Sequence, residues 1–316
     1  MYHQAVLGLA LNDAVQKQLT RDQAQLGGTR NAYTNLEIAL DVSLNMNRRA
    51  YPAGLTDHEW TILERQFPVS PYGRDELHTT REILNAIYYQ ARSGCAWRLL
   101  PHDLPPWGAV YSRFRRWVEA GTWERANAAL RTQVREEAGR SAEPTAGIID
   151  AQTVRTGGNR GDCHGHDAGK QTSGRKRHIL VDVLGLLLVL HVQAADVQDR
   201  LGAKQVLETL ARTVPTVRKV WADGGYSGPL VKGYAAAVPC EVEIVSRPPD
   251  AKGFVLLKRR WVVERTFGWL GKYRRLAGRD FETNPRHSEG WIYVCMTNLM
   301  VRRLAKVSIS RRVNVI

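Results

Sequence analysis

The chain has 316 residues, 43% of them hydrophobic, and its 45 Lys and Arg outnumber its 31 Asp and Glu to give a formal net charge of +14. A chain of this length and composition forms one large domain or two ordinary ones with hydrophobic cores, which excludes a disordered basic tail. The excess positive charge favours a polyanionic partner over a neutral metabolite.

The cysteines and the apolar runs indicate the compartment. The chain has four cysteines, far apart and without a C-x-x-C pair: Cys95, Cys163, Cys240 and Cys295. This spacing favours neither a disulfide framework nor a zinc ribbon, and a zinc site at Cys163, His164 and His166 would lack a spaced fourth ligand. No apolar run reaches the roughly 18 residues of a membrane span, and the first residues lack a basic n-region. We therefore expect a cytoplasmic protein.

The first part of the chain, residues 1–48, gives no indication of chemistry. It has few aromatic residues, nearly balanced charge and one weakly periodic apolar stretch, AVLGLALNDAVQKQL, which is compatible with an amphipathic helix. We interpret it as an N-terminal extension of unknown role, either translated from an upstream start codon or forming a loosely packed arm. Removal of residues 1–45 is predicted to leave activity intact.

Residues 49–135 are predicted to form a small all-α domain. Thr56 with Glu59, and Thr79 with Glu82, have the spacing of capping boxes at the starts of two helices. Gly94 is a suitable end for the second helix.

A third helix is predicted after Pro105 and Pro106, in WGAVYSRFRRWVEAG. Its core-facing residues would be Val110, Phe114, Trp117 and Val118. Its basic residues, mostly on the other side, are Arg113, Arg115 and Arg116. The order of helix, turn and basic helix favours a helix-turn-helix-like DNA-binding domain whose arginines reach bases and phosphates. The alternative is a small helical bundle with a solvated basic face.

A polar stretch, residues 136–146, is predicted to link this region to an α/β domain at residues 147–305. Strands are predicted in IIDAQTV, VRKVWADGG and CEVEIVSR, and a hairpin is predicted around Leu184 and Gly185. Helices are predicted in LGAKQVLETLART, PLVKGYAAAV, the segment around Glu264 and HSEGWIYVCMTNLMVRRLA. This order predicts a mixed α/β sheet flanked by helices. Residues 306–316 would form a basic tail.

Three carboxylates in this domain are candidates for an active site. Asp150 and Asp223 are expected to emerge at strand ends, and Glu264 lies beside the apolar stripe of its helix. Singly, each has an ordinary explanation, since Glu264 can pair with Arg260 one turn earlier and each Asp can turn the chain. Together, in a strongly basic chain, they favour oxygen ligands for two Mg²⁺ ions, with Mn²⁺ as a substitute, acting on a phosphodiester.

Several long motifs resemble one protein family. IIDAQTVRTGG, DAGKQTSGRKRHILVDVLGLLL, VWADGGYSG and RRWVVERTFGWLGKYRRL together look like the DDE transposases of bacterial insertion sequences, specifically the IS5 family within the IS4/IS5 superfamily. TDHEWTILERQFP and GCAWRLLPHDLPPWGAVYSRFRRW resemble the N-terminal domain of that family. The resemblance implies a ribonuclease H-like catalytic domain with Asp150, Asp223 and Glu264 as the metal-binding triad.

In the wider superfamily, the helix that carries the Glu has a Tyr, Arg, Glu, Lys signature. Arg260 and Glu264 match it here. Leu257 stands in the place of the Tyr, Gly271 stands in the place of the Lys, and Lys272 is the next residue. Basic residues near the acids are predicted to bind the DNA backbone. They are Lys170, Arg175, Lys176, Arg177, Arg260 and Lys272.

On this basis the chain is predicted to be a transposase that binds the terminal inverted repeats of its insertion sequence, cleaves the element ends and transfers the 3′-hydroxyl ends to target DNA. Its partners would be double-stranded DNA and a second copy in a homodimer, because two ends are brought together. No membrane partner is expected, and the protein would associate with the bacterial nucleoid. Two rival interpretations are a catalytically inactive DNA-binding protein derived from a transposase and a structure-specific DNA nuclease.

Overall fold

The computed structural model describes residues 49–68, 77–158, 161–246 and 259–313, with side chains described up to residue 307. The chain divides after Ala50 into two units, of which the second is Tyr51–Ile316. The predictions for residues 1–48 concern residues that lie outside the described ones. The predictions for most of the 306–316 tail concern residues whose side chains are not described. No described helix is both long and apolar enough to cross a membrane.

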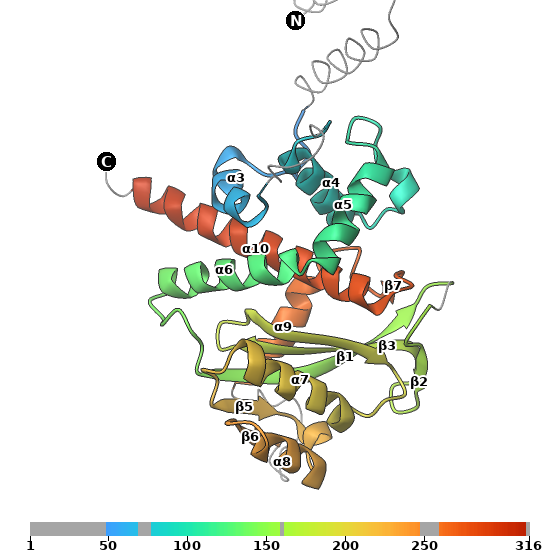
Figure 1. Ribbon diagram of the computed structural model, residues 1–316, viewed down its shortest axis with the longest axis vertical. Helices are drawn as coiled ribbons and strands as arrows, with labels where there is room; N and C mark the ends of the chain where they lie inside the picture. Colours follow the sequence, from blue (N-terminus) through green and yellow to red (C-terminus); the bar gives the residue numbers. More distant parts are fainter. Residues whose placement is uncertain (1–48, 69–76, 159–160, 247–258, 314–316) are drawn as a thin grey trace, which may run out of the picture. The chain divides into compact units, whose positions relative to one another are not determined.

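The N-terminal helices begin and end where their signals predict (Figure 1). They are α3 (Asp57–Leu63), η1 (Glu64–Gln66), α4 (Thr80–Ser93), η2 (Trp97–Leu99) and α5 (Trp107–Glu119). Complete capping boxes start α3, at Thr56 and Glu59, and α4, at Thr79 and Glu82. Gly94 ends α4 with a φ of 70°, a left-handed conformation that suits glycine because it lacks Cβ. Helix α5 buries the four apolar residues predicted for it.

Two longer helices, α6 (Thr122–Glu137) and α10 (Pro285–Val313), lie between those helices and the sheet (Figure 1). The sequence predicted α10 but no helix at α6, because the buried face of α6 is partly polar. Asn127 and Arg131 each donate a hydrogen bond of 3.0 Å to the carbonyl of Leu187, and Arg135 pairs with buried Asp182. The helices and the sheet share one hydrophobic core. The division at residues 136–146 stays a prediction, as does a DNA-binding role for the helices.

The sheet is built around its first strand. The strands are β1 (Ala146–Thr156), β2 (Gly165–Asp167), β3 (Thr172–Asp182), β4 (Leu187–Ala194), β5 (Lys219–Ala222), β6 (Glu241–Ile244) and β7 (Arg279–Asp280). β3 pairs antiparallel with β1 and β4, while β5 pairs parallel with the other edge of β1 and with β6. The order β4-β3-β1-β5-β6 is consistent with a ribonuclease H-like domain. The short strands β2 and β7 extend the outer edges of β3 and β1.

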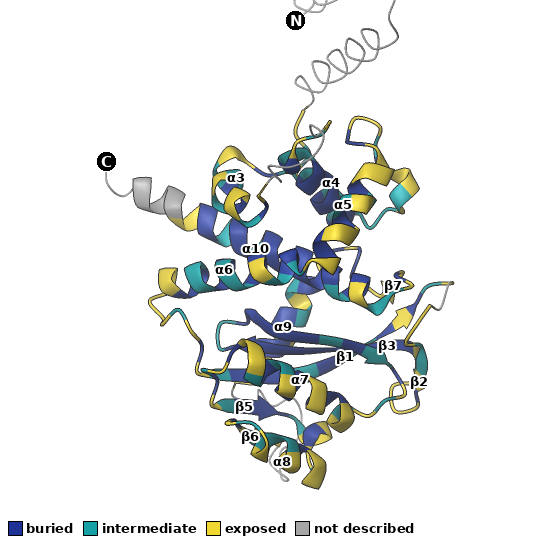
Figure 2. Ribbon diagram, in the orientation of Figure 1, coloured by how far each residue is buried: buried dark blue, intermediate teal, exposed yellow. Residues whose placement is uncertain are grey.

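Helices cover both faces of this sheet. The remaining ones are α7 (Asp199–Thr213), η3 (Gly224–Tyr226), α8 (Pro229–Ala236) and α9 (Trp261–Leu270). Ile149 and Leu180 belong to a cluster with residues of α7 and α8, whereas Ile148 and Val181 face the larger cluster with α9 and α10. Figure 2 shows the central strands β1 and β3 mostly buried between these layers and the outer sides of α7 and α8 exposed.

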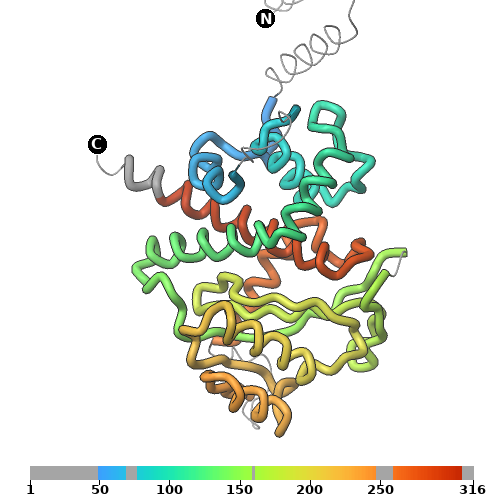
Figure 3. The backbone as a smooth tube through the Cα atoms, in the orientation of Figure 1, coloured from blue at the N-terminus to red at the C-terminus, as the bar shows by residue number. Residues whose placement is uncertain are grey.

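The first and last described segments meet on the helical side. Arg302 of α10 donates a hydrogen bond of 2.9 Å to the carbonyl of Pro52. Its guanidinium is also 3.9 Å from the carboxylate of Glu59. Figure 3 shows the start of the described chain beside the C-terminal helix. The last helix therefore joins the N-terminal helices to the sheet.

Candidate active site

Strands β1 and β5 place Asp150 and Asp223 at one level of the sheet. The strands are parallel, and Ile148 of β1 is the register partner of Trp221 of β5. Two residues further along each strand, the two acids therefore project from the same face. Asp223 follows the end of β5 as predicted. Asp150, however, lies in the middle of β1 and not at a strand end, because β1 continues to Thr156.

Arg260 lies between the two carboxylates. Its Nη2 atom is 3.5 Å from Oδ2 of Asp150 and 3.5 Å from Oδ2 of Asp223. The two oxygens are therefore at most twice that distance apart. The Oδ1 atoms accept backbone hydrogen bonds, from Ala151 at 2.7 Å and from Gly225 at 2.9 Å. Each carboxylate thus presents one oxygen to a shared cation.

The carboxylates of Asp150 and Asp223 are partly buried and repel each other, and Arg260 offsets their negative charge only in part. The side chains of Asp150 and Asp223 are 17% and 30% exposed. Burial, with the Asp223 carboxylate as a smaller cause, raises the pKa of Asp150 to about 6, against the opposing effects of the Ala151 N–H, Arg260 and Lys170. A cation bound by both carboxylates would favour their ionised forms.

Glu264 does not join this pair in the structure. It lies on α9 one turn after Arg260, and its side chain is exposed. Within the described ranges, no group of three or more His, Cys, Asp or Glu side chains is arranged to hold a metal ion. Two acids of the predicted triad therefore converge, and the third lies on the helix that carries their arginine. The role of Glu264 stays a prediction.

Asp199 is a further carboxylate near the pair, and the sequence analysis missed it. It is the first residue of α7, and its Oδ1 atom is 3.1 Å from Nζ of Lys176. A Cβ atom on Gly225, in the turn after Asp223, would lie 3.4 Å from its Oδ2 atom. Acidic residues are common in the first turn of a helix. Nothing in the sequence therefore distinguished Asp199 from an ordinary helix-start residue.

A chain of polar groups that the sequence did not indicate lies on the face of the sheet that α7 covers, opposite to the face from which Asp150 projects. The Tyr226 hydroxyl is 2.9 Å from Nδ1 of His178, and Nε2 of His178 is 2.8 Å from Nε2 of Gln193. Burial lowers the pKa of His178 to about 3, so the ring is neutral. With the Gln193 amide as donor, Nδ1 of His178 carries the proton and donates to Tyr226. Burial raises the pKa of Tyr226 well above its ordinary value, with smaller contributions from nearby carboxylates.

The basic cluster predicted at residues 174–178 is buried, so the prediction that it binds DNA phosphates is wrong. Arg175, Lys176 and Arg177 are 0%, 6% and 3% exposed, because β3 is covered on both faces. Arg175 donates to three backbone carbonyls and a serine hydroxyl. Lys176 donates to the carbonyl of Val197 at 2.9 Å, and Arg177 donates to that of Leu276 at 3.0 Å. These cations hold loops against the sheet.

Apart from Arg260, the other basic residues predicted to bind DNA are accessible. Lys170, Lys272, Arg115 and Arg116 are exposed, and Arg113 is half-buried. Arg115 forms an ion pair of 3.3 Å with Glu119 one turn later on α5. Lys170 lies close enough to the acids for its charge to lower the pKa of Asp150.

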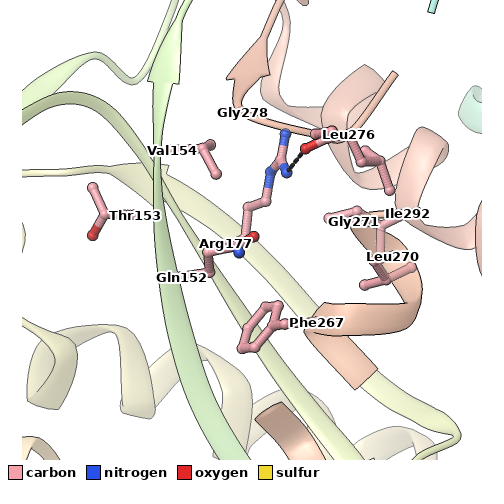
Figure 4. A pocket seen from close by; sticks show the side chains of 11 residues that line it. Gln152, Thr153, Val154, Arg177, Phe267, Leu270, Gly271, Leu276, Gly278 and Ile292 are labelled. Atoms are coloured by element: carbon pink, nitrogen blue, oxygen red, sulfur yellow. Dashed lines mark hydrogen bonds between the residues drawn. The ribbon is translucent and has the colours of Figure 1, made fainter. Parts of the chain in front are cut away.

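A cavity of about 260 Å³ lies beside the second half of β1 (Figure 4). The outer edge of β1 pairs with β5 at residues 146–148 and with β7 at residues 155–156. The cavity opens between these two pairings. Arg177 reaches into it and donates to the carbonyl of Leu276. The lining includes Gln152, Thr153 and Val154 of β1 and Phe267 and Leu270 of α9.

Comparison with protein families agrees with this geometry. Residues 141–299 match the family model described as "Transposase DDE domain", and residues 55–127 match a model of transposases of the IS4/5 family. The chain belongs to the DDE transposases of the IS4/IS5 family. It is therefore an enzyme of the class that binds DNA, cleaves it and transfers its strands with divalent metal ions.

A curated relative supplies no further activity. The uncharacterized protein y4sN of Sinorhizobium fredii (strain NBRC 101917 / NGR234) is 32% identical over 117 residues, which are 37% of this chain and 82% of that protein. Its name states no substrate or reaction. The substrate of this transposase therefore has to be inferred from its own residues.

Proposed function

We propose that the protein binds the terminal inverted repeats of its insertion sequence, cleaves the phosphodiester bonds at the element ends and joins the freed 3′-hydroxyls to target DNA with two metal ions. The observation that carries this proposal is the pair Asp150 and Asp223. Their Oδ2 atoms, from neighbouring parallel strands, each lie 3.5 Å from one guanidinium nitrogen. Two convergent carboxylates that share a cation suit phosphoryl chemistry.

The donor atoms of this pair fit Mg²⁺, with Mn²⁺ as a substitute. Asp150 and Asp223 direct one oxygen each at a single positive group, and Mg²⁺ binds carboxylate oxygens. Glu264, on the helix that carries Arg260, would supply the third carboxylate. Bound ions would activate the attacking water or 3′-hydroxyl and stabilise the leaving oxygen.

Arg260 would serve the site in two ways. Its guanidinium offsets the repulsion between the two acids, and it lies where it can instead bind a phosphate oxygen of the DNA. Arg259, directly before it, has a φ of 74°. A left-handed backbone at a residue other than glycine costs about 1 kcal/mol or more. The contacts of Arg260 with the two acids offset this cost and hold the start of α9 near them.

The accessible basic residues would guide the DNA to this site. Arg113, Arg115 and Arg116 on α5 would contact the inverted repeat from the helical region, residues 49–135. Lys170 and Lys272 would contact the backbone closer to the acids, since both are exposed. Two element ends have to be held together for transfer, so the active form would be a homodimer on DNA.

The test is cleavage, in Mg²⁺, of a labelled duplex that carries the ends flanking the gene. We expect cleavage at the element end, and a loss of about a thousandfold or more in the Asp223→Asn variant. Asparagine keeps the shape of the side chain and an acceptor for the Gly225 N–H. Glu208→Gln, an exposed change on α7, is the matched control and should leave cleavage unchanged.

The other outcomes decide between the rival interpretations. Binding without cleavage by either protein would identify a DNA-binding remnant. Cleavage of branched DNA regardless of the element ends would identify a structure-specific nuclease. Absence of binding to the element-end duplex would contradict the proposal that residues 49–135 recognise DNA.

A further inference from the structure

We propose a second DNA-binding site on this enzyme: a cleft where β1, β2, β3 and β7 meet, which binds backbone phosphates some nucleotides away from the cleaved bond. The cleft has a volume of about 580 Å³, and these strand ends lie together at one end of the sheet (Figure 1). The proposal rests on the proposed function, because it extends the DNA from the Asp150 and Asp223 site.

Two arginines define the cleft. Arg155 of β1 and Arg279 of β7 are direct register partners on adjacent parallel strands, and both are exposed. Like charges placed opposite each other destabilise a sheet. Within the described parts of the chain, neither guanidinium has an ion-pair partner. A phosphate bound between them would relieve their repulsion and form charge-assisted hydrogen bonds.

The remaining lining adds hydrogen-bond donors. Nδ1 of His164 is 2.9 Å from the Thr156 hydroxyl, and Nδ1 of His166 is 2.8 Å from the Ser173 hydroxyl. Because each ring uses Nδ1 within the protein, its Nε2 is the nitrogen left for a ligand. No described residue that lines the cleft is acidic; the carboxylate of Asp196 lies next to Gly165 at its edge.

Backbone strain is concentrated at the same place. Gln171, which lines the cleft, has a φ of 48°, and Cys163, directly before His164, has a φ of 56°. Left-handed backbone at residues other than glycine is costly and clusters at binding sites. The loops are thus held in conformations that their own residues do not favour.

Strand β1 sets the distance between the two sites. Asp150 and Arg155 are five residues apart on β1, which is roughly 16 Å along an extended strand, and this odd separation puts their side chains on opposite faces of the sheet. One strand of B-DNA has a phosphate about every 3.4 Å of axis, so a DNA backbone that passes around the outer edge of β1 reaches the cleft about five nucleotides or more from the cleaved bond. The cavity of Figure 4 lies between the two sites on the same edge of β1.

The experiment measures how salt affects binding to the element-end duplex, in the Asp223→Asn background so that the DNA stays intact. The slope of log K against log salt is negative, and removing one protein–phosphate interaction reduces its magnitude by about 0.9. We expect Arg155→Ala/Arg279→Ala, which removes the phosphate bound between the two arginines, to reduce the magnitude of the slope by about 0.9. The control is Arg140→Ala/Arg212→Ala, which removes the same charge from exposed positions outside the cleft. An equal change in the two double variants would overturn the proposal, and so would no change in either.

A second measurement locates the phosphate that the cleft binds. Neutral methylphosphonates, introduced one at a time along the element end, should weaken binding about five nucleotides or more from the cleaved bond, and this sensitivity should vanish in the double variant. If the double variant does not fold, Arg279→Gln on the short strand β7 replaces it. Persistence of the sensitivity in a folded variant would contradict the site. If the wild type never cleaves the duplex, the proposed function fails, and the salt slope still tests the cleft.

Discussion

Arg260 links the two acids of the candidate site. Its guanidinium stands at 3.5 Å from both Asp150 and Asp223, and all three side chains are largely buried. From the sequence, Arg260 was predicted to bind the DNA backbone, with an ion pair to Glu264 one turn later as the ordinary alternative. In the structure, Arg260 contacts the two acids that β1 and β5 bring to the start of α9.

An Arg260→Gln variant should bind Mn²⁺ more tightly than the wild type in the absence of DNA, because the guanidinium no longer competes for the same oxygens. A gain of about tenfold corresponds to a difference of about 1.4 kcal/mol in binding free energy. Electron paramagnetic resonance of free Mn²⁺ measures the affinity without any cleavage assay. Arg212→Gln, on the exposed end of α7, is the control. Weaker Mn²⁺ binding in Arg260→Gln would show that the arginine arranges the ligands and does not compete with the ion.

Helices α6 and α10 are connected to the sheet by buried polar groups. Arg135 of α6 pairs with Asp182, whose Oδ1 atom also accepts from the backbone of Leu184 and Leu186 in the β3–β4 turn. Glu289 of α10 accepts a hydrogen bond of 2.9 Å from the backbone of Val192 on β4. These contacts, with those of Asn127 and Arg131 to Leu187, attach both helices to the antiparallel part of the sheet.

Replacing Arg135 by Ala should destabilise the protein by about 3–5 kcal/mol, because Asp182 would remain buried without its cation. Urea unfolding monitored by tryptophan fluorescence measures the change. Arg140→Ala, at an exposed position just beyond the same helix, should change stability by no more than about 0.5 kcal/mol. Similar values for the two variants would mean that the buried pair contributes little.

Stability should fall with rising pH because of Glu289. Burial raises the pKa of Glu289 to about 7, above its ordinary value, so the folded protein holds this proton more tightly than the unfolded chain. This proton contributes up to about 3 kcal/mol to the free energy of unfolding. The contribution is present in full below about pH 4.5 and is lost as the pH rises through 7. Glu289→Gln, which keeps the acceptor for Val192, should reduce this loss. Urea unfolding of the wild type and of Glu289→Gln at pH 5 and pH 8 measures this loss of stability. An equal loss in the two proteins would contradict the prediction.

At the scale of the whole molecule, the helical region and the sheet form one body. In the described part of the chain, both hydrophobic clusters consist of residues from Leu55 onward. Helix α10 packs on α3, α4, α5, α6 and β4. A DNA end bound by α5 would therefore be held at a fixed distance from the acids.

A protein that starts at residue 49 should keep the melting temperature and cleavage activity of the full chain. The reason is that the unit Tyr51–Ile316 has its own core and contains every residue proposed for the site. Differential scanning calorimetry and the element-end cleavage assay measure the two properties. Loss of either one would assign residues 1–48 a part in folding or in DNA binding.

Local signals in the sequence were sufficient for the starts of α3 and α4, most of the strands and the place of Asp223 after β5, but not for α6 or for the place of Asp150 within β1. The capping boxes at Thr56 and Thr79 act within one helical turn. Asp223 follows a short strand that its own apolar residues predict. Only the tertiary structure decided the features that depend on which elements pack over one another. It buried Arg175 and Arg177 because β3 has helices on both faces, brought Asp199 beside Asp223 from a distant helix start, and stabilised α6 through polar groups that hydrophobic periodicity does not register. Burial and convergence depend on which elements pack together, and no short window of sequence contains that information.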